Sequence, residues 1–196
     1  MNTLCPIFIK LKDKKCLVVG GGQVAERKVN FLLASQADIT VVSPDLSKTL
    51  QLYARSKKIV YHARKFRPAD MDDAFLVIVA TDDNETNRAI YRLAEESNKL
   101  VNVVDVPELC NFYVPSVYQQ GDLKIAISTN GKAPALARYI REGLQKLFPE
   151  RIARDIEELD RLRRSQKKQL SGDLKRRETL ARQQAQNIIS SYFQAN

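Results

Sequence analysis

Apolar residues in the first half of the chain come in short, unbroken runs, separated by segments in which they recur at helical spacing. Runs rich in β-branched residues and without alternation are typical of parallel strands covered on both faces. The sequence predicts five such strands, at residues 15–19, 38–44, 57–66, 74–83 and 99–107. Strands that alternate with helices imply right-handed crossovers and a doubly wound sheet. The first half is therefore expected to be an α/β, Rossmann-like domain with a parallel sheet.

Two of the intervening segments show clear helix signals. After the first strand, apolar residues recur from Val24 to Leu33 on one face, with charged residues between them. The second helix is predicted over residues 84–98, where Asp82, Asp83 and Asn84 offer side chains that cap a helix N-terminus.

The pattern changes near residue 112. Residues 112–129 read as two strands around a Gln-Gly-Asp turn, which is typical of a hairpin. A helix is predicted from Pro134 to Phe148, followed by two highly charged helices with a break at residues 171–173. These last helices carry a thin apolar stripe, which needs a partner surface. Its members are Leu159, Leu162, Leu170, Leu174, Leu180, Ile188, Ile189 and Phe193.

Composition narrows the function classes. No apolar run is long enough to span a membrane, and the N-terminal residues lack the order of segments of a secretory signal. The three cysteines, Cys5, Cys16 and Cys110, are widely spaced, so neither a zinc site nor a disulfide framework is expected and a reducing cytoplasm is the natural compartment. The net charge of +9 suits nucleic acid, an anionic membrane surface or a polyanionic small molecule, or simply a solvated basic surface.

The glycine stretch after the first strand is the first candidate site. Residues 20–25 match the pattern GxGxxG/A between a strand and a helix, which is the context of a dinucleotide-binding turn. Gly20 allows the sharp turn, Gly22 lets a pyrophosphate approach closely, and Ala25 allows tight helix packing. Backbone amides at Gln23 and Val24 begin the helix, where phosphates bind. The alternative is a glycine turn in an α/β fold without a cofactor.

The tip of the second strand, where an acidic residue usually binds the adenosine ribose, reads Ser43-Pro44-Asp45. The Ser43 hydroxyl can still bind a ribose hydroxyl, and Asp45 either does the same or only forms a turn after Pro44. No arginine lies at this tip and Lys48 is the nearest base, so NAD is expected as the cofactor rather than NADP.

Polar residues follow the fourth and fifth strands at the edge where open α/β sheets bind ligands. Thr81 is a candidate cofactor contact, whereas Asp82 and Asp83 are explained by helix capping alone. Asp105 ends a very apolar run, where it is a candidate general base with a pKa raised by burial. The alternative is a turn aspartate before Pro107. Hydroxyl groups, a glycine turn and a helix start also meet at residues 128–142, which suits either anion binding or a plain connecting loop.

Four stretches together resemble the dehydrogenase/ferrochelatase family of siroheme synthesis. They are CPIFIKLKDKKCLVVGGGQVAERK, VIVATDDNETN, VNVVDVPELCNFYVPS and AISTNGKAPALARYIRE, and they span residues 4–142 in a consistent order. The resemblance implies NAD-dependent oxidation of precorrin-2 to sirohydrochlorin by a homodimer. It also implies three parts: an NAD-binding Rossmann domain at 1–112, a dimerisation region at 113–149 and a helical C-terminal domain at 150–196.

The resemblance also assigns roles to residues. Asp105 takes the place of the catalytic aspartate, and Thr129 stands where siroheme synthases carry a serine subject to phosphorylation, which puts that regulation in doubt. Precorrin-2 carries eight carboxylates, which a basic cleft would attract. The residues expected to hold them are Ser128, Thr129, Asn130, Lys132 and Arg138, with Arg141 as a further candidate. No protein-bound metal, nucleic acid or membrane is expected as part of this function.

Two alternatives stay open. The same cleft could also insert Fe²⁺ into sirohydrochlorin, with Asp105 removing pyrrole protons. A more remote alternative is a nucleotide-sensing or nucleic-acid-binding module, since residues 151–196 hold eleven Lys and Arg against six Asp and Glu. Mixed charges and the lack of a stacking aromatic set count against it.

Overall fold

The computed structural model describes residues 4–193, which fall into two compact units, 4–113 and 114–193. The described part leaves out residues 1–3 of the expected Rossmann domain and residues 194–196 of the expected C-terminal domain.

A five-stranded parallel sheet forms the centre of the first unit. Its strand order is β3-β2-β1-β4-β5, which confirms the predicted doubly wound sheet. In register, Leu17 of β1 lies opposite Thr40 of β2 and Val77 of β4. β1 has the predicted bounds, and the other four strands are shorter than predicted, because their flanking residues belong to the loops. Their bounds are β1 Lys15–Val19, β2 Asp38–Ser43, β3 Val60–Ala63, β4 Leu76–Val79 and β5 Leu100–Val103.

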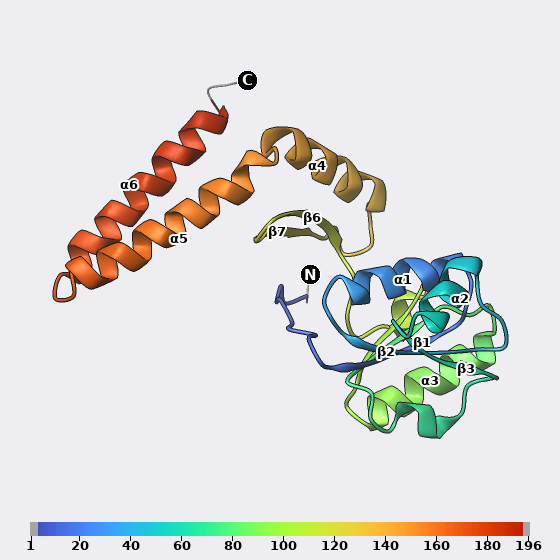
Figure 1. Ribbon diagram of the computed structural model, residues 1–196. Helices are drawn as coiled ribbons and strands as arrows, with labels where there is room; N and C mark the ends of the chain where they lie inside the picture. The colour runs from blue at the N-terminus through green and yellow to red at the C-terminus, as the bar shows by residue number, and fades with distance from the viewer. Residues whose placement is uncertain (1–3, 194–196) are drawn as a thin grey trace. The chain divides into compact units, whose positions relative to one another are not determined.

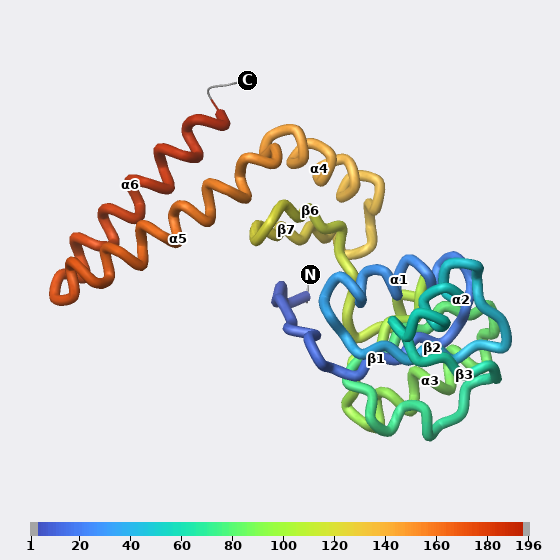
Figure 2. Tube along the Cα trace, viewed as in Figure 1, coloured from blue at the N-terminus to red at the C-terminus, as the bar shows by residue number. Residues whose placement is uncertain are grey.

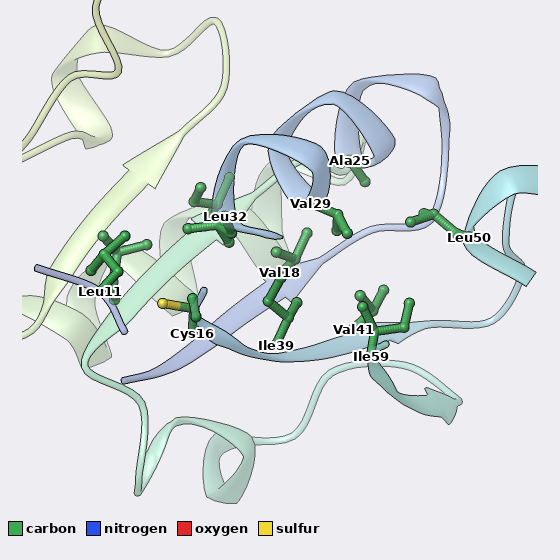
Figure 3. Close-up of a cluster of buried hydrophobic side chains, with 13 residues drawn as sticks. Leu11, Cys16, Val18, Ala25, Val29, Leu32, Ile39, Val41, Leu50 and Ile59 are labelled. Atoms are coloured by element: carbon green, nitrogen blue, oxygen red, sulfur yellow. The ribbon is translucent and has the colours of Figure 1, made fainter. Parts of the chain in front are cut away.

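Helices cover both faces of this sheet (Figure 1). The predicted helices α1 (Gln23–Leu33) and α3 (Asn84–Glu96) lie on opposite faces, and α2 (Lys48–Arg55) joins α1. Figure 3 shows Val18 and Val41 of the sheet packed beneath α1 and α2. Helix α2 was not predicted, because Leu50 is its one buried residue and the apolar pattern is correspondingly weak.

The connection between β3 and β4 contains a short 3-10 helix, η1 (Pro68–Met71), in place of a crossover α-helix. Two hydrogen bonds from the Arg64 guanidinium to Asp70, of 2.8 and 2.5 Å, hold this connection. A cavity of about 660 Å³ is bordered by this connection and by residues of β1, β2 and β3, including His62. None of the predicted site residues lines it.

The second unit begins with the predicted antiparallel hairpin of β6 (Ser116–Gln120) and β7 (Leu123–Ile127). Three helices follow, as predicted: α4 Pro134–Leu147, α5 Arg151–Gln169 and α6 Leu174–Phe193. Helices α5 and α6 run side by side (Figure 2). None of the helices within residues 4–193 combines the length and apolarity needed to cross a membrane.

Four buried hydrophobic residues hold the second unit together: Tyr118, Ala137, Ile152 and Tyr192. The Phe148 ring lies between the tyrosines, with ring centroids 6.5 Å from Tyr118 and 5.7 Å from Tyr192. The contact between α5 and α6 leaves part of the predicted apolar stripe uncovered. The exposed members are Leu162, Leu174, Ile189 and Phe193.

Candidate active site

The glycine loop between β1 and α1 is shaped by close backbone contacts. Gly20 has a φ of +119°, and a Cβ atom there would lie 2.1 Å from the Ala80 carbonyl oxygen. A Cβ at Gly21 would lie 1.8 Å from the Asp45 carbonyl oxygen. A Cβ at Gly22 would meet no atom within 4 Å. Gly20 and Gly21 are therefore required for packing within the protein, whereas Gly22 leaves open space in front of the helix.

The N-terminus of α1 keeps free hydrogen-bond donors. Gly22 is the N-cap residue and provides no side-chain cap. The Glu26 amide donates to the Gly22 carbonyl at 3.0 Å, whereas the amides of Gln23 and Val24 have no acceptor within residues 4–193. Free amides and the positive end of the helix dipole, beside the space at Gly22, fit a dinucleotide pyrophosphate.

The tip of β2 is fixed against the glycine loop. Ser43 is buried, and a Cβ built at Gly21 would lie 2.9 Å from its hydroxyl oxygen. The Tyr61 hydroxyl donates to the carbonyls of Ser43 and Pro44, 3.0 Å away in each case. Burial raises the pKa of Tyr61, and the charge of Asp45 adds to this. Pro44 and Asp45 are exposed, so the Asp45 carboxylate is accessible to a ligand. No sequence signal identified Tyr61, because its position depends on its pairing opposite Val41.

Thr81 and Asp83 follow β4, and their side chains form hydrogen bonds with the first turn of α3. The Thr81 hydroxyl donates to the buried Asn87 at 2.7 Å, and the Asn87 amide donates back to the Thr81 carbonyl at 3.1 Å. Asp83 accepts hydrogen bonds from the amides of Glu85 and Thr86, so its interpretation as a helix cap is confirmed. The Thr81 hydroxyl is therefore engaged within the protein, and Asn87 is the residue that orients it.

Asp105 lies in the turn after β5 and has a φ of +63°. Its side chain is exposed, so the expected burial is wrong: a left-handed residue at the tip of a turn projects away from the sheet. The neighbouring Val104 packs against the cluster that contains Val29 of α1. Lys28, next to Val29, is half-buried; burial lowers its pKa, and the charge of Asp105 acts in the opposite direction. Lys28 therefore interacts electrostatically with Asp105, a pairing that no sequence signal revealed.

The other predicted residues lie in the second unit, mostly in the loop before α4. The amide of Asn130 donates to the Ser128 hydroxyl, and the amide of Ala133 to the Thr129 hydroxyl, both at 3.1 Å. Lys132 is exposed in the same loop. The structure thus brings Ser128, Thr129, Asn130 and Lys132 into one loop at a helix N-terminus.

The arginines of α4 are partly engaged in ion pairs. Arg138 donates to Glu142 at 3.0 Å and Arg141 donates to the same carboxylate oxygen at 3.2 Å. Arg138 is exposed, so an anionic ligand would have to compete with Glu142 for its guanidinium.

Comparisons with known proteins identify the family of this chain. Residues 7–116 match a family model described as putative NAD(P)-binding, and residues 120–147 match one described as the central part of a sirohaem biosynthesis protein. A siroheme synthase of Methylobacillus flagellatus is 51% identical over 149 residues, which cover 76% of this chain and 32% of that protein. One from Nitrosomonas europaea is 42% identical and covers 81% of this chain and 34% of that protein. The chain thus spans about a third of the length of the curated relatives it matches.

One solved structure matches nearly the full length of the chain. SirC, a precorrin-2 dehydrogenase, superimposes with a TM-score of 0.75 and 25% identity, and the match covers 98% of each chain. The NAD(P)-binding model covers more than half of the chain, and the central segment follows it in order. The chain therefore belongs to the NAD(P)-binding family of siroheme biosynthesis that includes precorrin-2 dehydrogenases and the matching part of siroheme synthases.

Proposed function

We propose that this chain catalyses the NAD-dependent oxidation of precorrin-2 to sirohydrochlorin. The match to SirC carries this proposal, because it extends over 98% of both chains and includes the hairpin and helices as well as the nucleotide-binding fold. The siroheme synthases support the same pathway, although this chain corresponds to only a third of each.

The residues around the glycine loop suit NAD. The free amides of Gln23 and Val24 would hold the pyrophosphate beside the open space at Gly22. The Ser43 hydroxyl and the Asp45 carboxylate are the groups available to the adenosine ribose, and a carboxylate there disfavours the extra phosphate of NADP. When bound, NAD supplies the acceptor for the hydride that the substrate loses.

Asp105 is the proposed catalytic base. Oxidation of precorrin-2 to sirohydrochlorin removes two electrons and two hydrogens, one as hydride and one as a proton, and the Asp105 carboxylate takes up the proton. Its exposure leaves the carboxylate accessible to a substrate as large as a tetrapyrrole. The loop at Ser128–Lys132 and the Arg138 guanidinium would bind substrate carboxylates, and the net charge of +9 would favour encounter with an octacarboxylate.

Replacing Asp105 tests this assignment. We expect Asp105→Ala to lower kcat for sirohydrochlorin formation at least about a hundredfold, the usual scale for loss of a general base. NAD affinity should stay close to that of the wild type. Asp82→Ala is the matched control, because Asp82 is an exposed aspartate that follows β4, the neighbouring strand. Full turnover by the Asp105→Ala variant would overturn the role of Asp105.

A homodimer is the proposed state of the protein. On α4, an apolar face formed by Leu136, Tyr139, Ile140 and Gly143 is exposed, and Tyr139 is 75% accessible. This spacing forms one stripe along the helix, which is typical of a surface that another chain covers. We expect Tyr139→Glu to lower the dimer fraction measured by light scattering, whereas Tyr53→Phe, a change outside this unit, should leave it unchanged.

The three free cysteines support a reducing, cytoplasmic location.

Insertion of Fe²⁺ into sirohydrochlorin is a second candidate, favoured by the relatives named siroheme synthases. No group of three His, Cys, Asp or Glu side chains within residues 4–193 is arranged to hold a metal ion. The tetrapyrrole nitrogens would supply the ligands, and Asp105 would remove pyrrole protons. The protein is mixed with sirohydrochlorin and Fe²⁺ in the absence of NAD, and the change in absorbance is followed. This assay tests metal insertion separately from the oxidation.

A further inference from the structure

The turn that carries Asp105 is closed by the side chain of Cys110. The Cys110 thiol lies 3.2 Å from the Val103 carbonyl oxygen and 3.3 Å from that of Val106 and donates toward both. These carbonyls stand two residues before Asp105 and one residue after it. The amide of Val106 also donates to the Val103 carbonyl at 3.2 Å. One thiol thus joins the two backbone segments on either side of Asp105.

Cys110 is itself held against β5. The side-chain amide of Asn102 donates to the Cys110 sulfur at 3.4 Å and to the Phe112 carbonyl at 3.0 Å. The backbone of Asn102 and Cys110 forms an antiparallel bridge. Next to it, Asn111 exchanges hydrogen bonds with Val101: its amide donates at 3.0 Å and its side-chain oxygen accepts at 2.8 Å. Residues 110–112 therefore lie fixed along the outer edge of the sheet.

Asp105 needs such support. A φ of +63° is a left-handed conformation that side-chain-bearing residues adopt at an energetic cost, and it persists where the surroundings hold it. Cys110 is half-buried, and burial raises its pKa, so the sulfur keeps its proton and remains a donor at neutral pH. The charges of Asp105 and Cys110 both act to raise the pKa of Lys28 in α1, against the effect of its burial.

We propose that Cys110 is a positioning residue for Asp105: its thiol clamps the carbonyls of Val103 and Val106 and so fixes the direction of the Asp105 carboxylate. This inference rests on the proposed function, since it assigns Cys110 to the same reaction. Within residues 4–193, the hydrogen bonds of Cys110 are made to Val103, Val106 and Asn102 and not to the glycine loop, so its loss should affect the catalytic step and leave cofactor binding unchanged.

The experiment compares three forms of the full chain. Cys110→Ala removes the clamp, and we expect kcat for sirohydrochlorin formation to fall on the order of tenfold, because small displacements of a catalytic group are costly. The NAD dissociation constant should stay within about twofold. Cys110→Ser keeps a donor with a shorter reach, so its kcat should lie between those of the wild type and the alanine variant. Cys16→Ala is the matched control: Cys16 is buried in β1, and its loss should lower Tm without lowering kcat.

Two results would overturn the clamp. One is a wild-type kcat in Cys110→Ala. The other is a joint fall of kcat, Tm and NAD affinity in both alanine variants, which indicates a structural role alone.

A wild-type chain that binds NAD but does not oxidise precorrin-2 would instead reject the proposed function. Amide hydrogen exchange then tests the clamp without any measurement of activity. Exchange at residues 104–109 should be faster in Cys110→Ala than in the wild type, with β1 unchanged, and equal exchange rates would reject the clamp.

Discussion

The two units of the chain bury their apolar residues in different ways. In the first unit, a sheet separates two hydrophobic clusters, and strand residues such as Val18 and Val77 are completely buried under helices of the same unit. In the second unit, burial is limited to a few residues around Phe148, whereas α4 exposes an apolar face. The helices of the first unit therefore bury both faces of its sheet. The second unit is held together by one junction, formed by Tyr118, Phe148, Ile152 and Tyr192, and leaves an apolar face of α4 exposed.

This difference predicts which substitutions lower the stability of the fold most. The first unit should be most sensitive where backbone segments touch, because the packing at those contacts leaves no room for added atoms. Substitutions of apolar residues in the second unit should cost most at this junction, because few other helix residues of the unit are buried.

The largest effect is expected at Gly21, in the first unit. A Cβ there would lie 1.8 Å from the Asp45 carbonyl oxygen, so Gly21→Ala must displace the backbone of the β2 tip. We expect a loss of about 4 kcal/mol or more in the free energy of unfolding, measured in urea. Gly22→Ala is the control: its Cβ meets open space, so stability should be nearly unchanged while NAD affinity falls. If Gly21→Ala were as stable as the wild type, the glycine loop and the tip of β2 would not be in close contact.

A smaller loss is expected at the junction of the second unit. Ile152 is buried where α5 begins, and the Tyr192 hydroxyl of α6 donates to Asp155 in the same turn of α5. Ile152→Ala should cost about 2 kcal/mol, at the low end for large-to-small changes because the surrounding core is small. Faster amide exchange across α5 and α6 would report it. Leu162→Ala, at an exposed position of the same helix, should change stability by less than about 0.5 kcal/mol. Equal losses in the two variants would contradict a single junction.

The sequence predicted the parts of the fold that depend on local pattern. The apolar run at β1, the glycines after it and the periodicity of α3 each follow from residues adjacent in the chain. The glycine pattern also predicted the loop that we propose as the cofactor site, although it did not show that Gly21 packs inward and Gly22 faces open space.

Contacts between distant residues could not be predicted in this way. The Tyr61 hydroxyl reaches Ser43 only because β3 pairs with β2 in one particular register. The exposure of Asp105 depends on a left-handed turn that no residue pattern requires, since it is occupied by an aspartate and not by a glycine. For the C-terminal stripe, periodicity identified which residues share a helix face, but it contains no information about what covers that face.

The smallest effect, again in the first unit, concerns the connection that replaces a crossover helix. The Asp70 side chain is only 7% exposed, and its hydrogen bonds with Arg64 hold its pKa below the usual value of 3.8. A carboxyl group whose pKa is lowered by folding stabilises the folded state above its unfolded pKa, and this stability is lost as the pH falls through the folded pKa. Asp70→Asn should therefore lower Tm by roughly a few degrees at pH 7, with a difference that shrinks below about pH 4.

Asp73 gives the matched control for this prediction. It pairs with Lys15 at 2.7 Å in the same connection, but the two side chains are 77% and 62% exposed. Water and salt screen such a pair, so Asp73→Asn should barely change Tm at any pH. If thermal melts between pH 3 and pH 7 gave the same shift for both variants, the buried pair would contribute no more than the exposed one. The connection would then be held by Met71, which is buried against the sheet, and the first unit would rely on apolar packing even where it lacks a helix.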